Sequence, residues 1–147
     1  MMIGADYLPM PMLDHFITAQ NPIFNAALAE LRDGEKRTHW MWFVFPQIAG
    51  LGHSPMARRF ALFDLDAARA YLGHPVLGPR LREATEAVLA HGGHRTIAQI
   101  FGYPDDLKFF SSMTLFARAS GNQPSPFRMA LEQFFAGEED AGTTARL

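Results

Sequence analysis

The sequence predicts an all-α fold, a single compact domain of several helices that takes in residues 1–147. Apolar residues recur at helical spacing between capping and helix-breaking residues, and no stretch alternates polar and apolar residues as a half-buried strand would. The chain also has the length of one ordinary domain and contains no internal repeat or linker.

The first clear helical pattern follows Asn21. Asn21 and Pro22 have the residue types favoured at an N-cap and in the first turn of a helix. Gly34 has the type that most often follows the last turn. We therefore predict a helix over residues 21–33, with one apolar face made up of Phe24, Ala27, Leu28 and Leu31.

Three further helices are predicted between residues 54 and 92. Ser54, followed by a proline, is a start signal for a short helix through "MARRFAL", and Asp64 can cap another through "LDAARAYL". The third ends at the Gly92-Gly93 pair. Its apolar stripe at helical spacing consists of Leu77, Leu81, Ala84 and Val88.

The longest predicted helix begins at Pro104 and covers "PDDLKFFSSMTLFARAS". A short turn capped by Thr96 precedes it, and a last helix over "PFRMALEQFFAG" ends at a glycine. One face of the long helix is apolar and is expected in the core. The opposite face, which we expect to be solvated, carries Lys108, Ser111, Ser112, Thr114 and Arg118.

The segment "HWMWFVF", residues 39–45, is apolar at nearly every position, so its pattern does not distinguish a strand from a helix. Its aromatic residues and closing proline allow a short extended segment around residues 40–45. Read as a helix, the segment places His39, Trp42 and Phe43 on one side. We expect helix in more than half of the residues and any strand only in this neighbourhood.

Composition excludes several classes of function. Without cysteine there is no disulfide, thiolate nucleophile or Cys-ligated zinc. A net charge of −2 gives no basic excess, so we expect no nucleic acid polymer as partner. Residues 38–57 carry no Asp, Glu, Lys or Arg, but prolines and glycines interrupt them, which argues against a membrane span. The first twelve residues do not resemble a signal peptide, which favours a cytoplasmic location.

The main candidate for a binding site is the junction of basic residues and tryptophans. Lys36 and Arg37, followed by the hydroxyl of Thr38 and the imidazole of His39, can hold a phosphate or carboxylate. The face of Trp40 can stack on a planar ligand. Together they predict a site for an anionic planar metabolite such as a nucleotide. The alternative is that the tryptophans supply core area while the basic residues solvate a loop that enters the core.

Weak candidates for catalysis are also present. Lys108 lies within reach of Ser111 and Ser112, at i+3 and i+4, so a neutral lysine could activate a hydroxyl. The order is the reverse of the S-x-x-K arrangement, however, and a polar helix face is usually only solvated. His39 titrates in the range of a general base, although a lone histidine beside an apolar run is more often a hydrogen-bonded core residue. Whether the protein is an enzyme is left open.

A further anion site is conceivable at the turn "PQIAGLGHSP", where glycines can bring backbone N–H groups toward a ligand. Glycines and a Ser-Pro start signal are also sufficient as turn punctuation, and no Walker-type or dinucleotide pattern surrounds them. His91 and His94 flank two glycines without a third ligand at metal spacing, so we predict an exposed loop and no metal. The side chains that would line the turn site are Gln47, His53, Ser54 and Arg58.

Three stretches carry a family resemblance: "KRTHWMWFVFPQIAGLGHSPMARRFAL", "AYLGHPVLGPRL" and "PDDLKFFSSMTLFA". They resemble the bacterial family catalogued as domain of unknown function 1810, over roughly residues 13–137. The resemblance implies a mainly α-helical fold and no established activity. The label calpastatin, attached to some similar sequences, does not fit, because such an inhibitor is disordered and repetitive. The chain departs from the family in Phe109, where a leucine is usual, in its longer start and in its "TTARL" end.

These observations lead to one expectation and one alternative. We expect the tryptophan segment and the Lys108 helix to meet in one pocket that binds an anionic planar metabolite, without cofactor or metal. The alternative is a non-catalytic interaction module that docks an unknown protein partner through Trp40 and the basic pair. The ligand-binding residues predicted in this way are Lys36, Arg37, His39, Trp40, Gln47, His53, Ser54, Arg58, Lys108 and Ser112.

Overall fold

The computed structural model describes residues 13–147, and helix accounts for 61% of them. The start of the chain, where we expected no signal peptide, lies outside the described residues. No strand occurs in the described part, which confirms the all-α prediction. The helices are α1 (Asp14–Gln20), α2 (Phe24–Asp33), α3 (Met41–Val44), α4 (Pro55–Arg59), α5 (Leu65–Gly73), α6 (Leu77–Leu89), α7 (Ile97–Phe101), α8 (Asp105–Ala119), α9 (Pro126–Phe135) and α10 (Ala141–Thr144).

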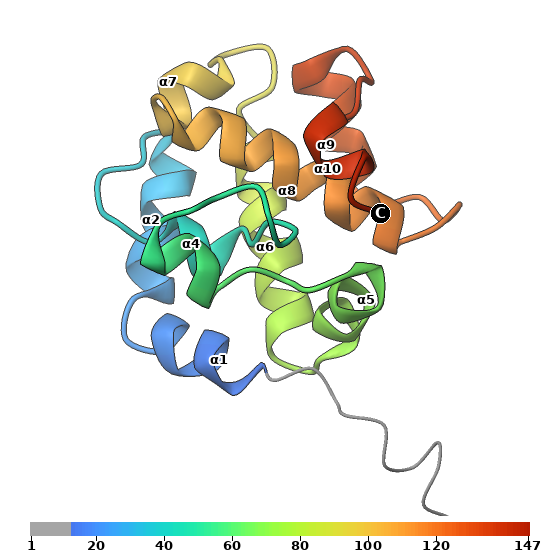
Figure 1. Ribbon diagram of the computed structural model, residues 1–147. Coiled ribbons are helices and arrows are strands. Elements are labelled where there is room, and N and C mark those ends of the chain that lie inside the picture. Colours follow the sequence, from blue (N-terminus) through green and yellow to red (C-terminus); the bar gives the residue numbers. More distant parts are fainter. Residues whose placement is uncertain (1–12) are drawn as a thin grey trace, which may run out of the picture.

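Helix α8 crosses the middle of the molecule, with α7 and α9 on one side and α5 on another (Figure 1). The C-terminal α10 also packs against it. Because helices cover it on several sides, the expected solvated face is largely absent: Ser111, Ser112 and Thr114 are 7%, 0% and 0% exposed. The hydroxyl of Thr114 donates to the carbonyl of Phe110, one turn earlier, and so its burial does not leave it without a partner.

The first helices of the described residues differ from the prediction, because an additional helix precedes the predicted one. A seven-residue helix, α1, precedes Asn21, and Asn21 caps its C-terminus rather than beginning α2. Ile23 is the N-cap of α2 and makes no side-chain capping bond. Helix α1 is too short to show a periodic pattern, which is why the sequence did not reveal it. Gly34 ends α2 in the left-handed conformation, φ 79°, as predicted.

Residues 41–44 form one helical turn, α3, so the extended segment considered for residues 40–45 is not formed. The turn is buried on more than one side, with Met41 and Val44 each 1% exposed and Phe43 7%. That burial explains its uninterrupted apolar sequence. An isolated parallel bridge joins Ile48 to Leu62, just beyond the segment where we expected any extended structure.

The caps predicted at Ser54, Asp64 and Thr96 are present. Ser54 and Asp64 accept hydrogen bonds from the backbone N–H groups of Ala57 and Ala67, at 3.1 and 2.8 Å. Thr96 forms a reciprocal capping box with Gln99 at the start of α7. Among residues 13–147, no helix is long and apolar enough to cross a membrane.

Candidate functional site

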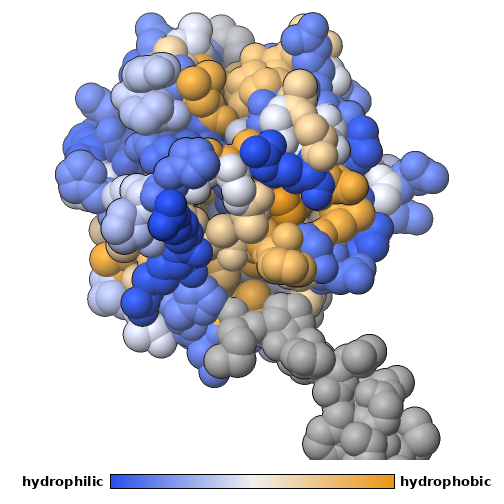
Figure 2. Space-filling model, viewed as in Figure 1, coloured by the Kyte–Doolittle hydropathy of each residue, from blue (hydrophilic) through white to orange (hydrophobic). Residues whose placement is uncertain are grey.

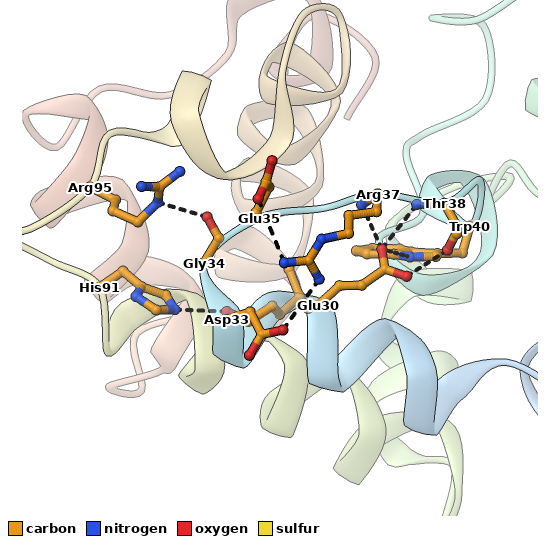
Figure 3. Close-up of polar contacts among 10 residues, drawn as sticks. Glu30, Asp33, Gly34, Glu35, Arg37, Thr38, Trp40, His91 and Arg95 are labelled. Carbon is orange, nitrogen blue, oxygen red and sulfur yellow. Dashed lines mark hydrogen bonds and ion pairs between the residues drawn. The ribbon is translucent and has the colours of Figure 1, made fainter.

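The carboxylate of Glu30, on α2, organises the predicted binding loop (Figure 3). It accepts the backbone N–H groups of Arg37 at 2.7 Å and Thr38 at 3.0 Å, the Thr38 hydroxyl at 2.6 Å and the Trp40 indole N–H at 3.0 Å. Glu30 is only 7% exposed. Burial raises its pKa, but these hydrogen bonds outweigh burial and lower the pKa to about 2. Glu30 is therefore a fixed anion that holds the loop, not a proton acceptor at neutral pH.

The indole of Trp40 is part of the core. It is 1% exposed and packs near the ring of Phe45, with centroids 6.2 Å apart. The ammonium nitrogen of Lys36 lies 4.9 Å from the centre of its ring. Because the side chain is enclosed in this way, Trp40 has no free face on which a ligand could stack, and the expectation that it does so is wrong.

The two predicted segments do meet, through Asp105 at the start of α8. Its carboxylate lies 2.8 Å from the Lys36 ammonium and 3.6 Å from that of Lys108. Lys108 in turn lies 5.2 Å from the ring centre of the half-buried Trp42. The Lys36 side chain is 7% exposed and also donates to the carbonyl of Thr38 at 2.6 Å. This contact therefore joins the loop to α8, and it uses the lysines that we expected to hold an anion.

Arg37 and His39 remain at the surface. The Arg37 guanidinium pairs with Asp33 at 3.2 Å and with Glu35 at 3.6 Å. Each of these pairs is about half exposed and so contributes little energy, but together they place two carboxylates beside the cation. Of the predicted loop residues, only His39 is exposed without a carboxylate partner in the described part of the chain.

The predicted lysine–serine pair is not formed. The Ser111 hydroxyl donates to the Asp140 carboxylate at 2.7 Å, and the same carboxylate accepts the Thr143 hydroxyl at 2.6 Å. Ser111 therefore anchors the C-terminal segment to α8. The Ser112 hydroxyl is fully buried and has no hydrogen-bond partner among residues 13–147. Lys108, one turn away, faces Asp105 and Trp42 instead.

The residues of the second predicted anion site, at the turn before α4, either take part in local structure or are exposed. Ser54 caps α4 with its hydroxyl, and the carbonyl of Gln47 accepts the backbone N–H of Leu62 at 2.9 Å. His53 and Arg58 are exposed. Within the described residues, no hydrogen bond or ion pair joins these four side chains to one another. The segment therefore forms a turn and the start of a helix, without an assembled binding site.

A hollow of about 390 Å³ lies instead between the turn that precedes α7 and the helix α9. Its volume is within the range of small-molecule sites. The sequence reading of this region considered only a metal, and no metal-binding cluster occurs among residues 13–147. We call it the Arg95 hollow, and its lining residues are Gly93, His94, Arg95, Thr96, Ile97, Gln133 and Phe134.

The guanidinium of Arg95 donates to two backbone carbonyls, of which Figure 3 shows that of Gly34. Its Nε donates to Gly34 at 2.7 Å and its Nη2 to Gln99 at 3.3 Å. A guanidinium has five N–H groups, so three remain, including both on Nη1. No carboxylate of the described residues lies within ion-pair distance of it. Carbonyls orient the guanidinium but do not neutralise it, so Arg95 is an oriented cation with free donors.

Two smaller hollows lie elsewhere. One, of about 330 Å³, is lined by Arg82 with serines, prolines and apolar side chains between α5, α6 and α9. Another, of about 250 Å³, lies beside Met129. Neither contains a residue of the predicted site. The Arg95 hollow alone of these three combines a cation, an imidazole and an aromatic ring in its lining.

Comparison with known proteins agrees with this fold. The model of a family described as "Protein of unknown function (DUF1810)" matches residues 11–147, which includes the "TTARL" end that we expected to lie outside the common core. The crystal structure of the conserved hypothetical protein Rv1873 from Mycobacterium tuberculosis is similar, with 51% sequence identity and a TM-score of 0.86. The similarity covers 92% of this chain and 95% of that one. No curated protein matches the chain.

Proposed function

The chain belongs to the DUF1810 family of proteins of unknown function, and from the geometry we propose that it binds a small anionic metabolite with a planar group in the Arg95 hollow. The ligand class is the one expected from the sequence. The place is different, because the predicted loop has its cations paired and Trp40 enclosed.

The observation that carries the proposal is the state of Arg95. A carboxylate or phosphate can accept two parallel N–H groups from a guanidinium, and Arg95 has three left. Its two bonds to Gly34 and Gln99 fix the side chain before any ligand arrives, which reduces the entropy lost on binding. By contrast, an anion at Lys36 would have to displace a carboxylate that already lies 2.8 Å from the ammonium.

The rest of the lining suits a planar group. Phe134 is partly buried against the core and offers an apolar surface, while His94 at the exposed edge offers a second ring. Thr96 lines the hollow too, but its hydroxyl caps α7. The proposal is one of binding and assigns no catalytic residue.

The predicted loop still has a role in this proposal, because it supports Arg95. The carbonyl that orients Nε belongs to Gly34, where the loop begins. Glu30 fixes the other end of the loop through Thr38 and Trp40. Lys36 ties its middle to α7, since its backbone N–H donates to Ile100 at 2.7 Å. The loop therefore positions Arg95 and does not itself bind the ligand.

The docking alternative is less well supported. Trp40, its proposed anchor, is buried. The large exposed apolar side chains closest to Lys108 in the sequence are Tyr103 and Leu107, which are 83% and 54% exposed. Single exposed apolar residues are common on protein surfaces, and two of them do not form a patch of the size that marks an interface. Figure 2 shows hydrophobic residues on one face interspersed with hydrophilic ones.

The proposal is tested with Arg95→Gln and a matched control, Arg82→Gln, which removes the arginine of the 330 Å³ hollow. Thermal shift and titration calorimetry would use AMP, UMP, orotate, benzoate and glucose 6-phosphate. We expect at least one planar anion to bind, with affinity reduced about 10- to 100-fold by Arg95→Gln and unchanged by Arg82→Gln.

Circular dichroism and the melting temperature would show whether each variant is folded. Arg95→Lys keeps the positive charge but loses the paired N–H donors of the guanidinium. We expect its affinity to lie between those of Arg95→Gln and the wild type. Absence of binding by every anion of the panel, or equal loss in both Gln variants, would contradict the proposal.

A further inference from the structure

We infer that the Gln133 amide hydrogen-bonds to the edge of the planar group. The Arg95 hollow then prefers an acid whose ring carries neighbouring hydrogen-bond donors and acceptors, such as a nucleobase, to an aryl acid without them. The inference rests on the proposed function and names the ligand class more narrowly. It is carried by the free carboxamide of Gln133 and by the glycine against which that carboxamide lies.

Gln133 projects from α9 into the lining of the hollow. Its amide makes no hydrogen bond to any described residue. A carboxamide offers an acceptor oxygen and two N–H donors in one plane. That combination matches the adjacent donor and acceptor of an amide, imide or aminopyrimidine edge, which is how glutamine recognises adenine in nucleic acids.

Gly92 leaves room for this amide. A Cβ atom at position 92 would overlap the Gln133 amide nitrogen and carbon, and would lie 3.1 Å from its oxygen. The carboxamide therefore occupies the space that any other residue at position 92 would fill. The backbone of Gly92 is not in the left-handed region, so an alanine there would act by displacing the Gln133 amide and not by straining the backbone.

Three groups of the lining then give three points of recognition. Arg95 holds the acid group, Phe134 faces the ring, and Gln133 faces its polar edge. A polar edge that hydrogen-bonds to the Gln133 amide gains binding energy that an analogue without that edge cannot gain. We expect a preference of about tenfold or more for the ring with the polar edge.

The experiment compares orotate with benzoate by titration calorimetry, because both are planar carboxylates and only orotate has an imide edge. Wild type should bind orotate at least about tenfold more tightly. Gln133→Leu should remove the preference by weakening orotate and not benzoate. Gly92→Ala should have the same effect without altering Arg95, whereas Gly73→Ala, where an added Cβ meets nothing within 4 Å, should have none.

The outcomes separate the two proposals. Equal affinity for both acids, or a preference that persists in folded Gln133→Leu, overturns the inference, while loss of binding in Arg95→Gln would still support the proposed function. If no anion of the panel binds, the proposed function fails and the inference fails with it. Gln133 is exposed on its helix, so Gln133→Leu remains a valid test if Gly92→Ala does not fold.

Discussion

The indole N–H of Trp40 donates to the carboxylate of Glu30 at 3.0 Å, and both side chains are buried. This bond ties the loop after α2 to the helix itself. A buried carboxylate is costly unless its oxygens are satisfied, and Glu30 accepts four hydrogen bonds from the loop and none from the other residues that the structure describes. The basic residues before Trp40 therefore mark a loop that enters the core.

Glu30→Gln should destabilise the protein by about 2–3 kcal/mol, because it replaces the charged hydrogen bonds to the loop by neutral ones. Urea unfolding followed by circular dichroism measures this change. Glu35→Gln is the matched control, since Glu35 is exposed and pairs only with exposed Arg37 at 3.6 Å. Its effect should stay within about 0.5 kcal/mol. Similar effects of the two substitutions would contradict the anchoring role of Glu30.

The stability of the fold should fall at acid pH. The pKa of Glu30 is lowered from 4.5 to about 2, and so is that of Glu139, which Arg118 and Arg128 contact. A carboxyl whose folded pKa is lowered stabilises the protein above its unfolded pKa and loses that contribution as the pH falls through the folded value. The loss should therefore occur between about pH 5 and pH 2. Unfolding measured at a series of pH values should give a shallower decline in Glu30→Gln, and identical slopes would contradict the role of Glu30.

Adjacent basic residues of the loop should differ sharply in their effect on stability. Lys36→Ala removes a 7% exposed ammonium that contacts Asp105 and the ring of Trp40, and we expect it to cost about 2–4 kcal/mol. Arg37→Ala removes a half-exposed cation and should change stability by less than about 0.5 kcal/mol. Chemical denaturation of both variants measures the difference. Equal costs would mean that the burial of Lys36 has no energetic consequence.

The sequence predicted the helix ends that depend on hydrogen bonds between residues close together in the chain. Ser54, Asp64 and Thr96 cap their helices because their side chains bond N–H groups three residues away, a relationship that the sequence contains in full. Helix α1 was missed because seven residues are too few to show a periodic pattern, and the turn α3 was left open because it is buried on several sides and has no polar face. Burial depends on what packs against the element, and local spacing does not record that.

The sequence led to the class of ligand that we propose, but not to the place where we propose that it binds. The loop and α8 were expected to meet, and Lys36 and Lys108 do so at Asp105, but the acids that pair with the basic residues of the loop were not identified from the sequence. Arg95 and Gln133 are single polar residues on different elements. Nothing in their neighbourhood in the sequence distinguishes them from other surface residues, and only the packing of α9 beside the turn before α7 brings them together.

The neighbouring serines of α8 should respond in opposite directions to the same substitution. Ser112→Ala removes a buried hydroxyl that has no partner among the described residues, so the folded state loses an unsatisfied polar group and should become more stable by up to about 1 kcal/mol. Ser111→Ala removes a bond to the Asp140 carboxylate and should cost about 1–2 kcal/mol, because that carboxylate then keeps only Thr143, and Asp140 is held to α8 only by its backbone N–H on the Thr114 hydroxyl among the described contacts. Midpoints of urea unfolding, at unchanged slope, measure both effects. If Ser112→Ala instead destabilises the protein as much as Ser111→Ala, the Ser112 hydroxyl has a partner such as an internal water, and its burial is satisfied after all.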